Sequence, residues 1–470
     1  MADEQSADAT VRDRGQGLGW TIAAVIVDDA SRSILLERST GEADSTGASL
    51  PTVELRDGEP SADLTFDLIG RLLGRAIAPL WLHYEEADDD LMSGVGAVMA
   101  PADTARDASN SREFVPAAEV IDRLESEVVR RHVRGWLDRL AGHPDPRTPP
   151  WLDPDWHPRV SGWIAERMTA AGLKPSGPSR LSYQSPLGAV LRTPAGDRDV
   201  YMKCPAALFR AEASVTQALA ARTPGWVPEV IDIEPTEGWL LMADLGDHQL
   251  GTDPEPAWAD GLRRLGEIER AWVGHGEELL AAGAAHRPLA ALAEAVPGLL
   301  ELGNLASRLD PSALERWSTD RQRLIDACHE LEDIGVPEAL VHGDAHPWNV
   351  AVTEGGPVVF DWSDTAFGPA FVDLAVFLWR AKDVAGRREL RDAYLDAWAD
   401  IAPRHRLERA AELAMPVGAL YQVTTYQTLL PQLPPWDQAV YAGADAHWLR
   451  NAIDALDRGL ESLDQRRAAG

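Results

Sequence analysis

The pattern of apolar and polar positions in the first third of the chain predicts a mixed domain. Residues 20–28 (WTIAAVIVD) and 33–39 (SILLERS) are rich in aliphatic side chains and are separated by the turn-like DDAS, which predicts a β-hairpin. Further strands are expected at 80–84 and 95–99, and helices at 63–73 and 117–140. We therefore predict an α+β domain over residues 18–142, preceded by a polar, disordered segment at residues 1–17.

A proline-rich segment follows this domain. Residues 143–158 contain six prolines and show neither a helical nor a strand period, which predicts a stiff linker. The pattern after it predicts a second domain, 159–470, with a small β-rich lobe (159–246) and a large helical lobe (247–470). The elements expected in the small lobe are helices at 160–171 and 208–221 and strands at 189–192, 200–203, 230–233 and 239–245.

The composition is that of a globular protein, and at 470 residues the chain is too long for one compact core. The two cysteines, Cys204 and Cys328, exclude a disulfide framework and disfavour a cysteine-based zinc site. The polar start MADEQSADATVRDRG lacks the apolar core of a signal peptide, and no later stretch has the roughly 18 apolar residues of a membrane span. We expect a cytoplasmic protein without a membrane partner.

The formal net charge is −31, from 75 acidic and 44 basic residues. A charge of this sign disfavours nucleic acid as a partner, because the phosphate backbone binds basic surfaces. We favour a solvated acidic surface as the explanation of this charge. A preference for a cationic small-molecule substrate is the alternative.

The densest group of chemically active residues lies in LVHGDAHPWNVAVTEGGPVVFDWSD. Two apolar segments, 350–352 and 357–360, flank a Gly-Gly turn there, which predicts a hairpin. Asp344 and Asn349 precede the first segment, and Asp361 follows the second. The hairpin should therefore bring these three side chains together at one end.

Such a group suits phosphoryl transfer. An acidic residue must accept or orient the proton of the acceptor hydroxyl, and oxygen ligands must hold the Mg²⁺ that neutralises the phosphates. We assign Asp344 as the base and Asn349 and Asp361 as the metal ligands. An aspartate in a turn is more often a cap or an Asx-turn residue. The order Asp, then Asn five residues on, then Asp after a hairpin repeats that of kinases, and we favour the catalytic interpretation.

With HGDxxxxN followed by a strand ending in FDW, the chain from about Trp151 resembles the aminoglycoside-phosphotransferase and choline-kinase superfamily. The resemblance implies a bilobal protein-kinase-like fold, ATP and Mg²⁺ as cofactors, and a small acceptor with a hydroxyl group. It also implies that Asp373, in FGPAFVDLAVFL, supports the catalytic loop from the start of a helix. His346 lies in the loop, where we favour a turn-shaping role over contact with phosphate.

A kinase also needs a strand lysine that pairs with the α- and β-phosphates and a helix glutamate that positions it. Lys203 ends the strand VYMK, and Glu212 lies on the next predicted helix. The order of these residues relative to Asp344 favours the nucleotide-binding role over a solvated strand end and a solvated helix face.

Two further segments are candidates for nucleotide contact. SYQSPLGA, with a single glycine, offers the backbone amides from Ser185 to Gly188 as a phosphate cap. LLMADLG resembles the connector of the family, whose backbone contacts adenine, here at Ala243 and Leu245. The chain lacks the FG that follows the metal aspartate in protein kinases and an A-P-E segment, which argues against peptide substrates.

Residues 18–142 faintly resemble a Nudix domain without its catalytic glutamates. DLTFDLIGRLLG supplies only Asp63 and Asp67 as acids, too few for a multivalent metal site. We interpret this domain as a degenerate Nudix-like or other α+β domain with a docking or regulatory role.

The leading hypothesis is a small-molecule kinase, and all its proposed groups lie within 151–470, which predicts that this fragment folds and acts alone. A pseudokinase-like nucleotide-binding module is the alternative, and a nucleotide hydrolase driven by the first domain is a third. The acceptor, the choice of ATP or GTP and the oligomeric state stay open. Tyr421, Gln422 and Tyr426 are candidates to line an acceptor pocket, although helix packing is the interpretation we favour.

Overall fold

The computed structural model describes residues 20–28, 30–37, 50–55, 62–73, 78–88, 91–99, 112–124, 127–143, 145–153, 155–382, 384–434 and 437–459. The segment 1–17, expected to be disordered, lies outside these residues. The chain forms two compact units, the first of residues 1–206 with 433–440 and the second of residues 207–432 with 441–470. The boundary between the units falls after Ala206, and the domain limits proposed above stay predictions.

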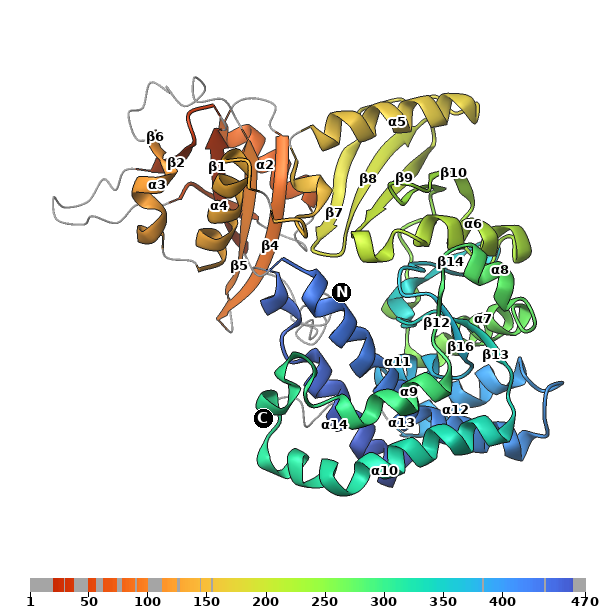
Figure 1. The fold of residues 1–470 in the computed structure, drawn as a ribbon. Helices are drawn as coiled ribbons and strands as arrows, with labels where there is room; N and C mark the ends of the chain where they lie inside the picture. The colour runs from red at the N-terminus through yellow and green to blue at the C-terminus, as the bar shows by residue number, and fades with distance from the viewer. Residues whose placement is uncertain are drawn as a thin grey trace. The chain divides into compact units, whose positions relative to one another are not determined.

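The first unit contains a six-stranded sheet near its N-terminus (Figure 1). The strand order is β4-β5-β1-β2-β6, and β3 also pairs with β1. Val27 of β1 faces Ile34 of β2 in antiparallel register, so the predicted hairpin is confirmed. The strands are β1 (Trp20–Asp28), β2 (Ser33–Glu37), β3 (Thr52–Leu55), β4 (Ala78–Asp88), β5 (Leu91–Met99) and β6 (Arg112–Pro116), and α2 (Ala62–Leu73) accompanies them.

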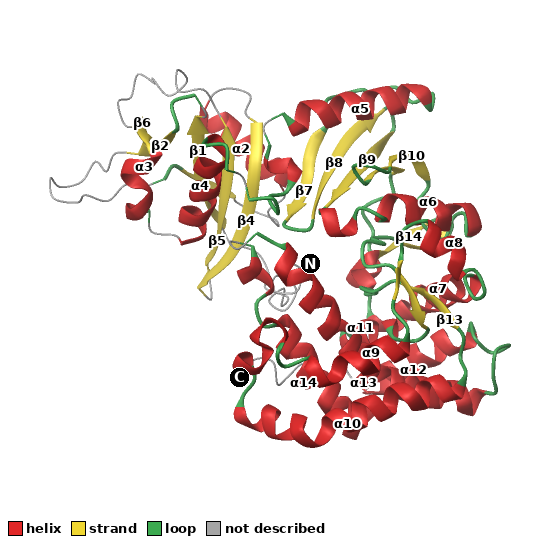
Figure 2. Cartoon of the chain, viewed as in Figure 1, coloured by secondary structure: helices red, strands yellow, loops and turns green. Residues whose placement is uncertain are grey.

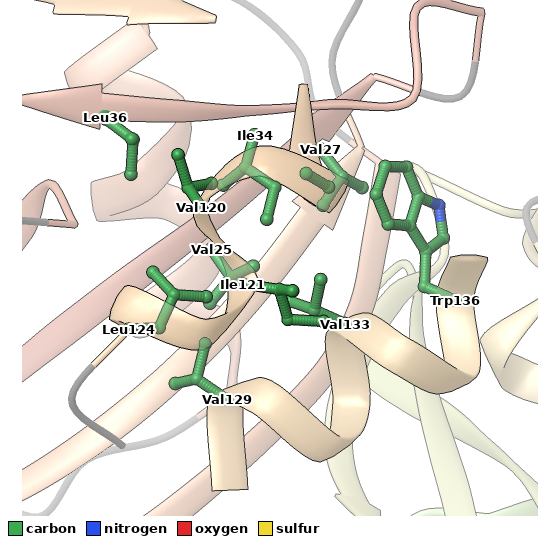
Figure 3. Packing of buried hydrophobic residues seen from close by; sticks show 11 residues of the cluster. Val25, Val27, Ile34, Leu36, Val120, Ile121, Leu124, Val129, Val133 and Trp136 are labelled. Atoms are coloured by element: carbon green, nitrogen blue, oxygen red, sulfur yellow. The ribbon is translucent and has the colours of Figure 1, made fainter. Parts of the chain in front are cut away.

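The core of this sheet lies between its strands and the helices that follow β6 (Figure 3). The predicted single helix 117–140 is wrong. The structure has α3 (Ala117–Val120), a 3₁₀ turn η2 (Ile121–Arg123) and α4 (Glu127–Leu140), because Leu124 is extended with φ −66° and ψ 131°. Leu124 is itself buried in the core. The break lets both helical segments direct apolar side chains into the same core, a tertiary effect that outweighs helix propensity.

The proline-rich segment is packed in its second half. Trp151, in the 3₁₀ helix η3 (Pro150–Leu152), and Trp156, the first residue of α5 (Trp156–Ala170), are each 3% exposed. Three antiparallel strands follow, with Ser185 opposite Gly188 across the first turn. Strand β7 packs against α2 and β4 of the same unit. The strands are β7 (Arg180–Ser185), β8 (Gly188–Ala195) and β9 (Arg198–Pro205).

The second unit is dominated by helices (Figure 2). It begins with α6 (Glu212–Arg222) and the antiparallel hairpin of β10 (Val230–Glu234) and β11 (Trp239–Ala243). The helices that follow are α7 (Trp258–Ala271), α8 (Gly276–Ala281), α9 (Leu289–Ala295), α10 (Pro311–Ile334), α11 (Asp373–Trp379), α12 (Val384–Asp396), α13 (Arg404–Leu429) and α14 (Ala444–Arg458). The remaining strands are β12 (Ala285–His286), β13 (Glu338–Val341), β14 (Val350–Thr353), β15 (Gly356–Val359) and β16 (Ala366–Pro369).

Helix α13 is the centre of the helical packing, and it lies against α10, α11 and α14. Its contact with the start of α11 depends on Gly418, where an added Cβ would lie 2.4 Å from the carbonyl oxygen of Val372. Only glycine permits so close an approach. The mixture of helices and sheets in both units confirms the predicted α+β class.

Among the described residues no single helix is long and apolar enough to cross a membrane, and one bent pair, Leu289–Gly298 with Leu302–Arg308, meets that test by length and composition alone.

Candidate active site

The hairpin β14–β15 brings two polar segments together, as predicted. Val350 pairs with Val359 in the register that closes the hairpin. Beyond this pair the amide of Phe360 donates to the carbonyl oxygen of Asn349 at 2.9 Å. Asp361 is therefore the residue that follows the last backbone pairing of the hairpin, and this pairing places it near Asn349.

The backbone of the loop His342–Asp344 is held from two helices. Asp373, the first residue of α11, accepts hydrogen bonds from the amides of His342 at 2.7 Å and Gly343 at 2.9 Å. From α13, the side-chain amide of Gln422 donates to the carbonyl oxygen of Gly343 at 2.6 Å. Gly343 itself has φ +87°, a conformation that favours glycine. These contacts fix the loop that presents Asp344.

Asp344 is buried and has two polar side chains beside its carboxylate. The Nε2 of His346 lies 3.5 Å from Asp344 Oδ2. The side-chain amide of Asn349 donates to the Asp344 carbonyl oxygen at 3.0 Å and lies 3.4 Å from Oδ2. Burial alone would raise the pKa of Asp344, but the charges and hydrogen bonding of His346 and the charge of His342 outweigh it and lower this pKa. The carboxylate is therefore ionised at neutral pH.

The second ring nitrogen of His346 is a buried group with no hydrogen-bond partner among the described residues. The ring itself is 3% exposed. The one polar side-chain contact described for it is with Asp344. The polar contact of His346 is therefore with the carboxylate of Asp344, inside the loop.

Asp361 stands in an uncommon backbone conformation, with φ +65°. The turn that follows is closed by the indole of Trp362, which donates to the Val359 carbonyl oxygen at 3.0 Å. Ser363 Oγ lies 2.7 Å from Asp361 Oδ1 and 3.1 Å from Glu212 Oε2. Glu212 is the first residue of α6 and is 2% exposed. One serine thus bridges two of the predicted site residues.

A further buried carboxyl group, that of Glu269, lies near Asp373. Glu269 on α7 is 1% exposed and accepts a hydrogen bond from the hydroxyl of Tyr394 on α12. Burial, together with the charge of Asp373, raises the pKa of Glu269 well above its usual range. Burial also raises the pKa of Asp373. Burial therefore favours the neutral form of Glu269, which lies next to the aspartate that holds the loop.

The remaining candidate residues lie in strands and turns of either unit. In the first unit, Ser185 Oγ accepts a hydrogen bond from the amide of Leu187 at 3.1 Å, and Lys203 faces Val190 in the β8–β9 pair. In the second unit, the amide of Ala243 donates to the Glu229 carbonyl oxygen at 3.0 Å. The pairing of Lys203 with Glu212 and the nucleotide roles of Ser185, Gly188, Ala243 and Leu245 stay predictions.

Part of the chain matches a known protein family. Residues 189–411 match the family model described as the phosphotransferase enzyme family. Over this segment the chain is similar to that phosphotransferase family. The match confirms the predicted resemblance, the kinase-like fold that it implies and the predicted class of enzyme, a small-molecule phosphotransferase. A search of curated proteins found no match.

Three solved structures with a similar fold share little sequence identity with this chain. A macrolide 2'-phosphotransferase type I shares 18% identity over 60% of this chain and 96% of its own, with a TM-score of 0.44. A choline/ethanolamine kinase family protein from Mesorhizobium loti shares 18% identity over 65% and 98%, with a TM-score of 0.47. A spectinomycin phosphotransferase bound to ADP and spectinomycin shares 12% identity over 64% and 98%, with a TM-score of 0.41.

The family match begins at residue 189, so the Nudix-like interpretation of residues 18–142 has no support from it. The helical candidates for the acceptor pocket are buried in the structure. Tyr421 is buried beneath the guanidinium of Arg287, whose Cζ lies 3.4 Å from the ring centroid, and Tyr426 is buried as well. Gln422 holds the carbonyl oxygen of Gly343.

Sequence reasoning missed Ser363 and Glu269. In the sequence, Trp362 and Ser363 after Asp361 indicated only a difference from protein kinases. A hydroxyl two residues after an aspartate is, however, a common turn pattern. Glu269 follows Leu262 and Leu265 at helical spacing, so it falls on the buried face of α7. An acidic residue on an apolar stripe is the signal that could have revealed it.

Proposed function

We propose that the chain is an ATP- and Mg²⁺-dependent kinase that transfers the γ-phosphate to a hydroxyl group of a small polar molecule. The observation that carries this proposal is the position of Asp344. Its buried, ionised carboxylate lies beside Asn349, at the end of the hairpin from which the chain continues into Asp361. Phosphoryl transfer needs an acid-base group and oxygen ligands for a cation in this relation.

In the proposed step the acceptor oxygen forms a bond to the γ-phosphorus, and the bond from that phosphorus to the β,γ-bridging oxygen breaks, so that ADP leaves. The hydroxyl proton passes to the Asp344 carboxylate. Because the pKa of Asp344 is lowered, this group is a weak base. It orients the hydroxyl and accepts its proton as the bond to phosphorus forms, which suits a loose transition state.

Asn349 and Asp361 fit Mg²⁺ by donor type, since the cation prefers carboxylate and amide oxygens. The amide nitrogen of Asn349 donates a hydrogen bond to the Asp344 carbonyl oxygen. The amide oxygen of Asn349 therefore points away from that carbonyl group. No cluster of three or more histidine, cysteine or acidic residues suited to a metal occurs in the part of the chain that the structure describes. Mg²⁺ bound here would neutralise charge on the β- and γ-phosphates.

The nucleotide part of the proposal assigns Lys203, positioned by Glu212, to the α- and β-phosphates and the Ser185–Gly188 turn to the phosphate cap. The amide of Ala243 already donates a hydrogen bond to the Glu229 carbonyl oxygen. We therefore assign the carbonyl oxygen of Ala243 and the amide of Leu245 to adenine. A cytoplasmic location, where ATP is abundant, belongs to the same proposal. A cationic acceptor stays the alternative explanation of the net charge of −31, after a solvated acidic surface.

Calorimetry with ATP, with and without Mg²⁺, tests the nucleotide and metal parts. Wild-type protein should bind ATP more tightly with Mg²⁺, and Asp361→Ala should abolish this dependence, since the cation loses a charged oxygen ligand. Unaltered Mg·ATP affinity in Asp361→Ala would exclude the assignment. The pseudokinase alternative predicts the same binding and differs in turnover.

A further inference from the structure

Ser363 occupies a position between two carboxylates that come from distant parts of the sequence. Its hydroxyl is 2.7 Å from Asp361 Oδ1, two residues away, and 3.1 Å from Glu212 Oε2, 151 residues away. The first contact is ordinary turn chemistry. The second is not, because it ties helix α6 to the turn that carries Asp361.

We propose that Ser363 is a positioning residue that sets the orientation of the Asp361 carboxylate and couples it to Glu212 on α6. This inference rests on the proposed function, in which Asp361 is a ligand of Mg²⁺. A hydroxyl has a single hydrogen to donate. The shorter distance marks Asp361 as the principal acceptor, and Glu212 lies close enough to share the donor.

The surroundings of Ser363 explain why this orientation requires support. Asp361 has φ +65°, a conformation that an aspartate adopts with some strain and that nearby contacts must maintain. The turn is closed by Trp362, and the hydroxyl of Thr365 donates to the Trp362 carbonyl oxygen at 2.7 Å. These bonds fix the backbone, whereas Ser363 contacts the carboxylate itself.

The contact with Glu212 gives the arrangement a consequence beyond the turn. Glu212 is 2% exposed and stands in the first turn of α6, so its carboxylate needs polar partners. Ser363 is one of them. A displacement of α6 therefore changes the donor available to Asp361, and the affinity for the cation should depend on the position of this helix.

The test measures ATP binding by calorimetry across a range of Mg²⁺ concentrations, for which no acceptor is needed. Outer hydrogen-bond partners of metal ligands typically contribute about 10- to 100-fold in metal affinity. Ser363→Ala should therefore raise the Mg²⁺ concentration for half-maximal binding by about tenfold or more, and Ser363→Thr, which keeps the hydroxyl, should restore it. Ser363→Cys, of similar size but a weak donor, should resemble Ser363→Ala and serves if the alanine variant folds poorly.

The matched control is Ser307→Ala, because Ser307 Oγ donates to the carbonyl oxygen of Asn304 at 2.8 Å in an exposed turn, and it should match wild type. The effect of Glu212→Gln should also be smaller in the Ser363→Ala background. An unchanged Mg²⁺ dependence in Ser363→Ala, equal losses in the alanine and threonine variants, or strictly additive effects with Glu212→Gln would overturn the inference. Wild-type protein without Mg²⁺-dependent ATP binding would instead defeat the proposed function, and the inference with it.

Discussion

At the scale of single residues, the proposed chemistry depends most on Asp344. Asp344→Asn keeps the shape of the side chain and its packing but removes the ionised oxygen. We expect turnover to fall by about 10²- to 10⁴-fold, the usual contribution of a positioned acid-base group, while the melting temperature and the affinity for Mg·ATP change little. Steady-state kinetics and calorimetry on the same preparation measure both.

Asp326→Asn on α10 is the control for Asp344→Asn, since Asp326 accepts a hydrogen bond from Gln322 on the surface of that helix. It should behave as wild type. Lost nucleotide affinity with unchanged turnover in Asp344→Asn would reverse the assignment of this residue.

Glu269 gives a prediction about stability and pH. Its pKa in the folded protein is well above the value of about 4.3 expected for the unfolded chain. The raised pKa of Glu269 therefore contributes fully to the free energy of unfolding below the unfolded-state pKa of about 4.3. This contribution is lost as pH rises towards the pKa of Glu269 in the folded protein. Glu269→Gln does not titrate, so its melting temperature relative to wild type should increase between pH 5 and pH 8.

Glu267→Gln, on the same helix but 37% exposed in its side chain and paired with Arg264, controls for the loss of one surface charge. Its difference from wild type should vary much less over this range. If the difference between Glu269→Gln and wild type were constant or shrank with rising pH, Glu269 would be ionised in the folded state.

Residues close in sequence were the ones that could be predicted. Asp344, Asn349 and Asp361 are separated by one loop and one hairpin, so strand pairing alone brings their segments together. Gln422, 79 residues from Gly343, could not be assigned to the loop, because its contact arises from the packing of α13. Spacing in the sequence carries no information about such a contact.

At the scale of elements, the approach of α13 to α11 determines how firmly Asp373 supports the loop. In Gly418→Ala the new Cβ would lie 2.4 Å from the Val372 carbonyl oxygen and 2.7 Å from the Ala375 Cβ. Overpacking of this kind costs about 1 to 3 kcal/mol. We expect a lower free energy of unfolding and reduced turnover, measured by denaturant titration and kinetics.

Gly162→Ala in α5 is the matched control, because an added Cβ there meets nothing within 4 Å. It should be neutral or stabilising by up to about 1 kcal/mol, since alanine favours the helix. Equal stability of the two variants would show that α13 and α11 can separate without cost.

The hairpins at Trp20–Glu37 and Val350–Val359 were predictable because local alternation and turn residues specify them. The break in the predicted helix 117–140 was not. Its sequence is amphipathic throughout, and the extended backbone coincides with the burial of Leu124 in the core.

At the scale of the whole molecule, the fragment 151–470 tests how far the chemistry is independent of the first 150 residues. Strand β7 packs against α2 and β4, within one compact unit, and truncation removes both partners. We expect the fragment to fold and to keep turnover that depends on Asp344, but to melt below the full chain. Thermal melting and kinetics of both proteins measure this, and equal melting temperatures would show that these contacts contribute nothing to stability.

The proposed function requires that the full chain transfers phosphate from ATP to a hydroxyl acceptor. Its most direct test is a mass-spectrometric screen of amines, sugars and hydroxyl-bearing antibiotics incubated with ATP, Mg²⁺ and the full-length protein. We predict at least one acceptor that gains a single phosphate, with an equal amount of ADP, and no product without Mg²⁺ or with Asp344→Asn. ADP release that is independent of every acceptor and unaffected by Asp344→Asn, or Mg·ATP binding without any phosphorylated product, would contradict it.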